Sequence, residues 1–256
     1  ILSNLFFLCN AQEQEILPRG FAPGEELKMD AYLKSRSNRA SQTSAPTLPV
    51  RSAAQWEESQ ALLITWTAFP TIHRQIVAAA QLECTVIIHC ADSNAVKADL
   101  TTNGIPLTNL KFIQVAFNSI WIRDYAANTC YLNDVDSLIL VDWIYNRPRP
   151  YDDDIPLAYS SFLGIPLYQT QTPPTDLMNT GGNWMVDGIE TAFASKLVLQ
   201  ENDGAGSYSL AYPNHTQTEI DSITHDYLGI NRYMKMHVLK SDRINHMTAF
   251  TILICT

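Results

Sequence analysis

Short apolar runs alternate along the chain with longer segments in which apolar residues recur every three or four positions. The runs span four to seven residues and are rich in Val, Ile and Leu, which is typical of buried strands, whereas the longer segments are typical of amphipathic helices. This alternation predicts an α/β fold. We expect strands at 61–66, 85–89, 111–116 and 137–143 and a strand pair around Asp187-Gly188 within 185–198, and helices at 73–82, 94–103, 154–163 and 216–228.

The first 49 residues do not share this pattern. Residues 1–9 are apolar and end in Cys9-Asn10-Ala11 before Gln12, which is typical of a secretory signal peptide cleaved after Ala11, although a plain apolar strand would look similar. Residues 12–49 are polar and irregular and predict a flexible N-terminal segment. We therefore expect a signal-peptide remnant at 1–11, a flexible segment at 12–49 and a folded domain at 50–256. No other segment is apolar over the length that a membrane span requires.

Composition narrows the possible functions. The formal net charge of −9 disfavours nucleic acid and anionic membranes as partners and is compatible with a cationic ligand such as an arginine side chain. The five cysteines include no CxxC pair, so neither a disulfide framework nor a zinc cage is predicted. The glycine-rich nucleotide-binding motifs, HExxH and GxSxG are absent, which disfavours the common cofactor-dependent enzymes and serine hydrolases.

Two charged segments could bind a ligand. The first, Trp-Ile-Arg-Asp-Tyr at 121–125, could hold a guanidinium, because a carboxylate accepts two parallel N–H bonds while an aromatic ring packs on the planar face. An Arg-Asp pair at a strand end is more often a structural ion pair. The second, Tyr-Asn-Arg-Pro-Arg-Pro at 145–150, presents two arginines on a loop that the prolines stiffen. It is either a solvated basic loop or an anion site suited to a peptide carboxylate.

Two further segments are less specific. The sequence Thr-Gly-Gly-Asn at 180–183 contains paired glycines, Gly181 and Gly182, that would let the backbone approach a ligand closely and position Asn183. A plain glycine turn would look the same. The fourth segment, Arg-Ile-Asn-His, ends at His246 near the C-terminus. A lone histidine is more often structural than catalytic, so His246 is a candidate only because the other three segments precede it.

Taken in order, these four segments resemble the Porphyromonas-type peptidylarginine deiminases, which share a superfamily with the agmatine deiminases. The similarity runs from about residue 50 to residue 246, and Ala-Gln-Trp-Glu at 54–57 is similar to the family's N-terminal motif. The resemblance implies a pseudo-fivefold α/β propeller of ββαβ modules. It also implies hydrolysis of a guanidine to a ureido group and ammonia with neither a metal nor an organic cofactor, in a secreted, periplasmic or cell-surface protein of a bacterium.

The resemblance also implies roles for individual residues. Asp124 would bind the guanidinium, Trp121 would line its pocket, and His246 would be the general acid and base. Arg147 and Arg149 would hold the C-terminal carboxylate of a peptide ending in arginine. Since agmatine has no carboxylate, the arginine pair favours an arginine-containing peptide or protein as the partner of this site.

The sequence departs from the family after His246. Thr248 stands where the family has a second guanidinium-binding carboxylate, and the family's later nucleophilic cysteine has no counterpart, because Cys255 lies too close to His246 to replace it. Loss of one G from ATG-GAC-TGC-TTT would give the Met-Thr-Ala-Phe of 247–250, so we expect a frameshift. A deiminase without its thiolate loses most of its rate.

We therefore expect about three of the five modules, an open sheet edge that favours aggregation, and an inactive fragment of a peptidylarginine deiminase. A non-catalytic binder of C-terminal arginines and an agmatine deiminase-like enzyme are the alternatives.

Overall fold

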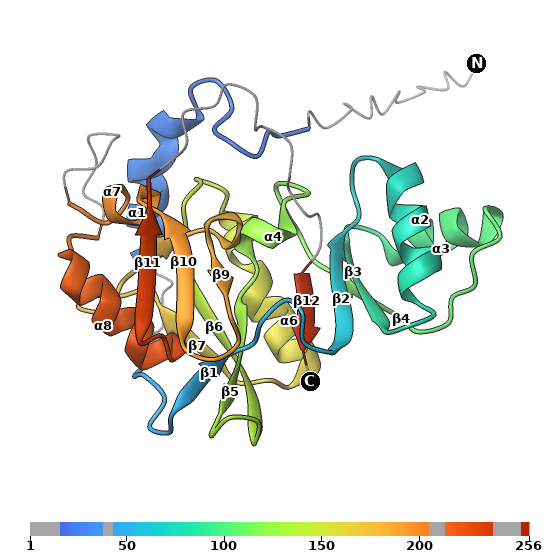
Figure 1. The fold of residues 1–256 in the computed structure, drawn as a ribbon. Coiled ribbons are helices and arrows are strands. Elements are labelled where there is room, and N and C mark those ends of the chain that lie inside the picture. Colours follow the sequence, from blue (N-terminus) through green and yellow to red (C-terminus); the bar gives the residue numbers. More distant parts are fainter. Residues whose placement is uncertain (1–15, 38–42, 205–212, 238–251, 256) are drawn as a thin grey trace, which may run out of the picture.

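The computed structural model describes residues 16–37, 43–204 and 213–237, and the backbone of 252–255. It confirms the α/β expectation, with three sheets and helices packed on them (Figure 1). The described helices are η1 (Glu25–Lys28), α1 (Met29–Ser37), α2 (Pro70–Ala80), α3 (Ser93–Thr102), α4 (Ile122–Tyr125), α5 (Pro150–Asp153), α6 (Ile155–Leu163), η2 (Gly181–Asn183), α7 (Leu197–Gln200) and α8 (Gln217–Leu228). The described strands are β1 (Val50–Ser52), β2 (Ser59–Thr65), β3 (Thr85–Cys90), β4 (Leu110–Gln114), β5 (Asn128–Leu132), β6 (Ser137–Tyr145), β7 (Leu167–Thr170), β8 (Met178–Asn179), β9 (Met185–Val186), β10 (Thr191–Ser195), β11 (Arg232–Met236) and β12 (Ile252–Cys255).

The sheet that contains β2, β3 and β4 is buried on both faces. These three strands are parallel, and β12 pairs antiparallel with β2. Side chains alternate along each strand. Leu62 and Ile88 pack with residues of α2 and α3, whereas Leu63 and Ile87 pack with residues of α4 and α6. Burial on two faces explains why β2 and β3 are continuous apolar runs rather than alternating ones.

The other two sheets repeat one order of elements. In the first, β5 pairs antiparallel with β6, and β6 pairs parallel with β7 across α6. In the second, β9 pairs antiparallel with β10, and β10 pairs parallel with β11 across α8. Each therefore has the ββαβ order that the resemblance implies. β1 and β8 extend the first sheet through β5 and β6, respectively.

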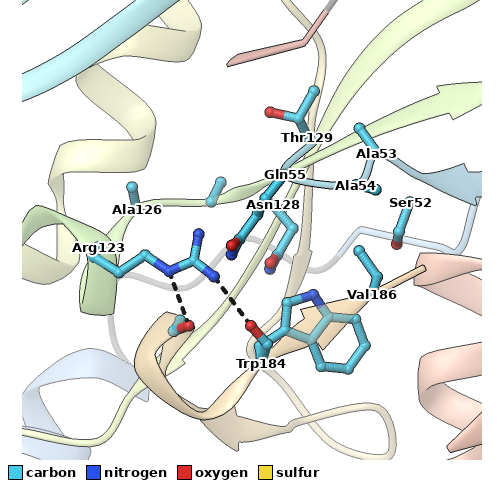
Figure 2. Close-up of a pocket in the computed structure, with 12 residues that line it drawn as sticks. Ser52, Ala53, Ala54, Gln55, Arg123, Ala126, Asn128, Thr129, Trp184 and Val186 are labelled. Atoms are coloured by element: carbon cyan, nitrogen blue, oxygen red, sulfur yellow. Dashed lines mark hydrogen bonds between the residues drawn. The ribbon is translucent and has the colours of Figure 1, made fainter. Parts of the chain in front are cut away.

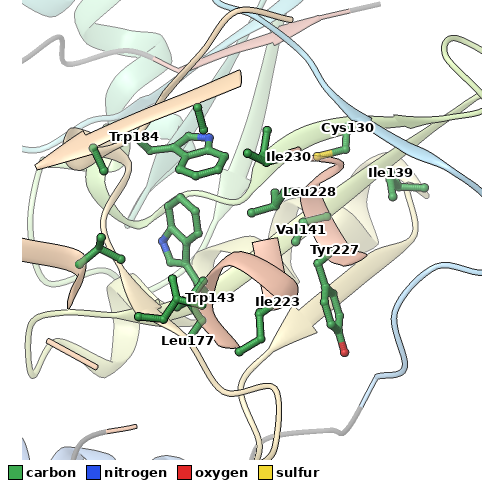
Figure 3. Packing of buried hydrophobic residues seen from close by; sticks show 14 residues of the cluster. Cys130, Ile139, Val141, Trp143, Leu177, Trp184, Ile223, Tyr227, Leu228 and Ile230 are labelled. Carbon is green, nitrogen blue, oxygen red and sulfur yellow. The ribbon is translucent and has the colours of Figure 1, made fainter. Parts of the chain in front are cut away.

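An aromatic cluster joins these two sheets beneath α8. Trp143 of β6 packs edge-on against Trp184, with ring centroids 5.6 Å apart (Figure 3). Trp184 packs in the same way against Tyr233 of β11. Ile223 and Tyr227 of α8 complete this core. Because the cluster spans β6, β11 and the chain after η2, it fixes the glycine segment relative to the end of β6.

Most predicted elements are confirmed within a few residues. The predicted helix at 216–228 is α8, which begins at Thr216 with a capping box to Glu219. Of the predicted strand pair within 185–198, β9 and β10 are present, but residues 197–198 lie in α7. β5 and β7 were not predicted, because short strands that mix polar and apolar residues have no clear periodicity.

The N-terminal segment differs from the expectation of a flexible region. Residues 25–37 form η1 and α1, with Met29 and Tyr32 buried against Ile144 of β6. Arg36 of α1 is also buried and pairs with Asp153. The sequence pattern of this segment is weakly amphipathic, so tertiary contacts rather than periodicity hold it in place. The signal-peptide remnant expected at 1–11 lies outside the described residues.

Candidate guanidinium site

Asp124 lies in α4 and is a buried carboxylate without a hydrogen bond at one oxygen. Its side chain is 4% exposed, and Oδ1 has no hydrogen-bond partner among the described residues. Burial raises the pKa of Asp124, and the positive charges of Arg19 and Arg147 act in the opposite direction. A buried carboxylate that lacks a donor is costly unless a ligand supplies one. A planar cation that donates N–H groups would meet this requirement.

The paired glycines of η2 pack directly against α4. A Cβ on Gly182 would collide with Oδ1 of Asp124, and a Cβ on Gly181 would collide with the backbone oxygen of Arg123. Position 181 therefore requires glycine, whereas a larger residue at position 182 would force the side chain of Asp124 to move. The sequence predicted a close approach of backbone to a ligand, whereas in the structure the backbone approaches the carboxylate that would bind the ligand.

Asn183 does not join this site. Its Oδ1 accepts a hydrogen bond from Ser195 N at 2.8 Å, and its Nδ2 donates to Ser195 O at 3.5 Å. Both bonds attach η2 to the end of β10. Asn183 therefore holds the glycine segment in place, which corrects its interpretation as a ligand-binding residue.

Arg123 points away from its neighbour Asp124. Its Nε donates to Gly181 O at 3.1 Å and its Nη2 donates to Trp184 O at 3.0 Å, beside a cavity of about 50 Å³ (Figure 2). Burial lowers the pKa of Arg123. A structural Arg-Asp ion pair, the alternative for this motif, is absent from the described contacts. Because the cavity is not lined by Asp124, Trp121 or the two arginines of the 145–150 loop, it is separate from the candidate site.

Arg149 is engaged within the protein, contrary to the expectation that it binds a substrate carboxylate. It is 1% exposed and pairs with Glu25 of η1 at 2.8 Å. Its Nη2 also donates to Pro18 O at 2.7 Å and to Gly20 O at 2.9 Å. The side chain that neutralises Arg149 comes from the segment that was expected to be flexible, so the sequence pattern could not reveal it.

Arg147 and Trp121 contact the same N-terminal segment. Arg147 Nε donates to Arg19 O at 3.3 Å, and its guanidinium lies 4.4 Å from the centre of the Phe21 ring. Trp121 Nε1 donates to Leu17 O at 2.9 Å. Residues 17–25 are called the N-terminal strap below. The strap thus contacts Trp121, Arg147 and Arg149, and the positive charge of Arg147 acts on Asp124.

The triple aspartate after the arginine loop has three different roles. Asp152 accepts hydrogen bonds from Asn118 N at 2.7 Å and Ser119 N at 2.9 Å, Asp153 pairs with Arg36, and Asp154 lies at the N-cap of α6. Asp154 stands at the start of the helix predicted at 154–163, whereas Asp152 and Asp153 lie in the short helix α5 before it. The other two attach α5 to neighbouring segments and so position the arginine loop.

Sequence reasoning missed several polar residues near this loop. Glu201 is buried, accepts a hydrogen bond from Asn146 Nδ2 at 2.8 Å, and has no described partner at Oε2. Burial raises the pKa of Glu201 to about 7. Asn179 and the Tyr145 hydroxyl are likewise buried without a described partner. No motif marks Glu201 or Asn179, and only the pairing of β8 with β6 brings Asn179 beside Tyr145.

Some predicted features cannot be placed. His246 and Thr248 lie outside the described residues, and only the backbone of Cys255 is described, in β12. Within the described ranges, no three metal-ligating side chains cluster. None of the helices described is both long and apolar enough to cross a bilayer.

Comparison with solved structures shows the fold. A protein provisionally assigned as an agmatine deiminase superposes with a TM-score of 0.62 and 19% identity, over 75% of this chain and 57% of that one. A Porphyromonas gingivalis protein provisionally assigned as an arginine deiminase gives a TM-score of 0.59 and 17% identity, over 73% and 57% of the two chains. The agmatine deiminase of C. jejuni gives 0.56 and 17%, over 73% and 55%. The chain therefore spans little more than half the length of these structures.

The family model of the Porphyromonas-type peptidyl-arginine deiminases matches residues 48–251. This range includes all four motifs, the glycine segment that packs on Asp124, and all the described strands apart from β12. The chain therefore belongs to the Porphyromonas-type peptidyl-arginine deiminase family.

Proposed function

We propose that this chain carries the guanidinium-binding half of a hydrolase that converts peptidyl-arginine to citrulline and ammonia. The observation that carries the proposal is the carboxylate of Asp124, which is buried, lacks a donor at Oδ1 and lies against Gly182. A guanidinium would supply N–H donors to that oxygen and offset its desolvation. The indole of Trp121, which lies three residues before Asp124, would line the same pocket.

The loop at 145–150 supports a peptide rather than agmatine as the substrate. Arg147 and Arg149 already donate to three backbone carbonyls of the strap, those of Pro18, Arg19 and Gly20. Agmatine offers no peptide carbonyl to such donors. Glu25 and the strap occupy Nε and Nη2 of the buried Arg149, whose Nη1 has no described partner, so the half-buried Arg147 is the more accessible candidate for contact with a C-terminal carboxylate.

The catalytic half of the reaction lies beyond the described site. His246 is proposed as the general acid and base, and a thiolate nucleophile would be needed to attack the guanidinium carbon. The ββαβ order of two sheets supports modules of a pseudo-fivefold propeller, of which this chain would contribute about three. A chain that lacked this nucleophile would bind substrate and release no ammonia.

A binding experiment tests the proposal. Isothermal titration of Nα-acetyl-arginine methylamide into the wild-type chain should show binding, and Asp124→Asn should weaken it about thirtyfold or more, because the charged half of the contact is lost. Asp136→Asn removes an exposed carboxylate and should bind as wild type does. Equal affinity of Asp124→Asn and wild type would overturn the proposal.

Two further measurements separate the alternatives. Ammonia release during the titration would indicate a complete hydrolase rather than a non-catalytic binder. Tighter binding of agmatine than of the acetylated arginine amide would favour the agmatine deiminase-like alternative, because only agmatine lacks the peptide groups that the arginine loop would contact.

A further inference from the structure

The C-terminal end of α7 contacts both the arginine loop and the strand that precedes the paired glycines. Glu201 and Asn202 are adjacent there and are buried, at 3% and 0% exposed. Glu201 Oε1 accepts a hydrogen bond from Asn146 Nδ2 at 2.8 Å. Asn202 binds the backbone of Met178 in β8, since its Oδ1 accepts from Met178 N and its Nδ2 donates to Met178 O, both at 2.8 Å. Two neighbouring side chains thus attach α7 to two different segments of the candidate site.

The two contacts fix different ends of that site. β8 leads directly into the glycine segment that packs on Asp124, so Asn202 acts on the guanidinium end. Glu201 acts instead on the loop that carries the two arginines. The described pairing of β6 with β8 ends at Tyr145 and Asn179, so Asn146 is the first loop position that strand pairing does not hold. Glu201 therefore holds the loop at the point where backbone pairing stops.

The hydrogen bond between Asn146 and Glu201 is shielded from solvent. Asn146 is 2% exposed, and Glu201 Oε2 has no hydrogen-bond partner among the described residues. Water cannot easily replace either partner at such a buried position, so loss of the glutamate oxygen would leave the Asn146 amide without an acceptor. The contact therefore favours a single orientation of Asn146.

Asn146 in turn holds the guanidinium of the next residue. Its backbone oxygen accepts a hydrogen bond from Arg147 Nη1 at 2.7 Å. Arg147 Nε donates to Arg19 O at 3.3 Å, and Nη2 has no hydrogen bond among the described contacts. Arg147 is half-buried, so Nη2 is the donor that could bind a carboxylate from a ligand. Its direction depends on Asn146, and that of Asn146 depends on Glu201.

We propose that Glu201 is a positioning residue for Arg147, acts through Asn146, and thereby sets the affinity of the site for the C-terminal carboxylate of a substrate. The inference rests on the function proposed above and extends it to a residue outside the four motifs. Glu201 itself does not contact the ligand. Since Asp124 would bind the guanidinium from another segment, loss of Glu201 should affect only ligands that carry the carboxylate.

Calorimetric titrations with two ligands test this selectivity. Nα-acetyl-arginine carries a free carboxylate, and Nα-acetyl-arginine methylamide has the same guanidinium without one. Glu201→Ala should bind the acid about tenfold more weakly than wild type and the amide equally well, because Asn146 loses its acceptor. Glu201→Gln keeps an oxygen at this position and should bind the acid within about threefold of wild type. A general loss of structure would instead weaken both ligands.

Asn146→Ala removes the same hydrogen bond from the loop side and should show the same selective loss. It also decides the question if Glu201→Ala does not fold. Because the two residues form one link, the double variant should lose no more affinity for the acid than either single variant. The matched control is Gln200→Ala, which changes the exposed neighbour of Glu201 on α7 and should bind both ligands as wild type does.

The proposal is overturned if Asn146→Ala binds the acid as wild type does, if it weakens acid and amide equally, or if the losses add in the double variant. Glu201→Gln as weak as Glu201→Ala would also overturn it. If wild type binds the acid no better than the amide, the role of Glu201 falls but the guanidinium site stands. If Asp124→Asn binds both ligands as wild type does, the guanidinium site itself is wrong.

Discussion

Asp153 and Asp124 are both buried aspartates near the arginine loop, yet their surroundings differ. Asp153 is 5% exposed, and its Oδ1 accepts hydrogen bonds from Arg36 Nη2 at 3.0 Å and from Tyr145 N at 3.2 Å. Asp124 is 4% exposed and has no described donor at Oδ1. The first carboxylate joins α1 to the body of the protein, whereas the second keeps an oxygen that could accept a hydrogen bond from a ligand. Burial alone therefore does not distinguish the two aspartates. The hydrogen-bond donors around each carboxylate do.

The largest expected effect is on stability when each aspartate is replaced by asparagine. Asp153→Asn leaves Arg36 buried without a counter-charge and should cost about 3–5 kcal/mol of unfolding free energy. Asp124→Asn removes a buried charge that has no described hydrogen bond at Oδ1 and should leave stability unchanged or slightly raised. Urea denaturation of both variants measures the difference. Equal losses would show that Asp124 has a structural partner.

The adjacent glycines Gly181 and Gly182 allow stability and ligand affinity to be tested separately. Gly181→Ala forces a Cβ onto the backbone oxygen of Arg123, so we expect a loss of about 1–3 kcal/mol in unfolding free energy. Gly182→Ala forces it onto Oδ1 of Asp124, a side-chain atom that can rotate away. Gly182→Ala should therefore cost less stability and more affinity for Nα-acetyl-arginine methylamide. Thermal unfolding measures the stability of both variants, and calorimetry measures their affinity. Equal changes in the two variants would contradict this expectation.

Glu201 is an intermediate case, with one oxygen bonded and one without a described partner. Its pKa rises from an ordinary value of 4.5 to about 7 on folding because of burial. The folded state then holds the proton more tightly than the unfolded state, so stability should fall as pH rises from about 4.5 to about 7, by at most ~1.4 kcal/mol per pH unit. Glu201→Gln should flatten this decline in urea midpoints measured across that range. An unchanged pH profile would mean that Glu201 is ionised at neutral pH.

The smallest expected effect concerns Trp121. Trp121→Phe keeps the aromatic ring but removes the hydrogen bond to Leu17 O, which should lower the unfolding free energy by about 1 kcal/mol. Deuterium exchange should rise at 17–21 and remain unchanged in the sheet of β2, β3 and β4. Equal protection of the strap in both proteins would show that Trp121 does not hold it.

The sequence by itself determined the elements with strong local signals. Because β2 and β3 are buried on both faces, they are continuous apolar runs and were predicted to within two residues. The helix predicted at 216–228 was placed to within one residue of α8, whose start carries a capping box between Thr216 and Glu219. The order of four motifs was enough to identify the family and to name Asp124, Trp121 and the arginine pair. Local signals did not mark α1, β5 or β7, which are held by contacts with distant segments.

Only the tertiary structure decided which of these groups are free to bind a ligand. Arg149 looks the same in the sequence as Arg147, but Glu25, 124 residues earlier, neutralises it, and no periodicity links the two. Asp124 and Asp153 are equally apt carboxylates until Arg36 is found beside one of them. A motif shows which residues are close together in the sequence. The desolvation of a charged side chain depends instead on all the segments that pack around it in the fold. For this reason the sequence could name candidate residues for the site, but it could not identify the partners, such as Glu25 and Arg36, that surround them in the fold.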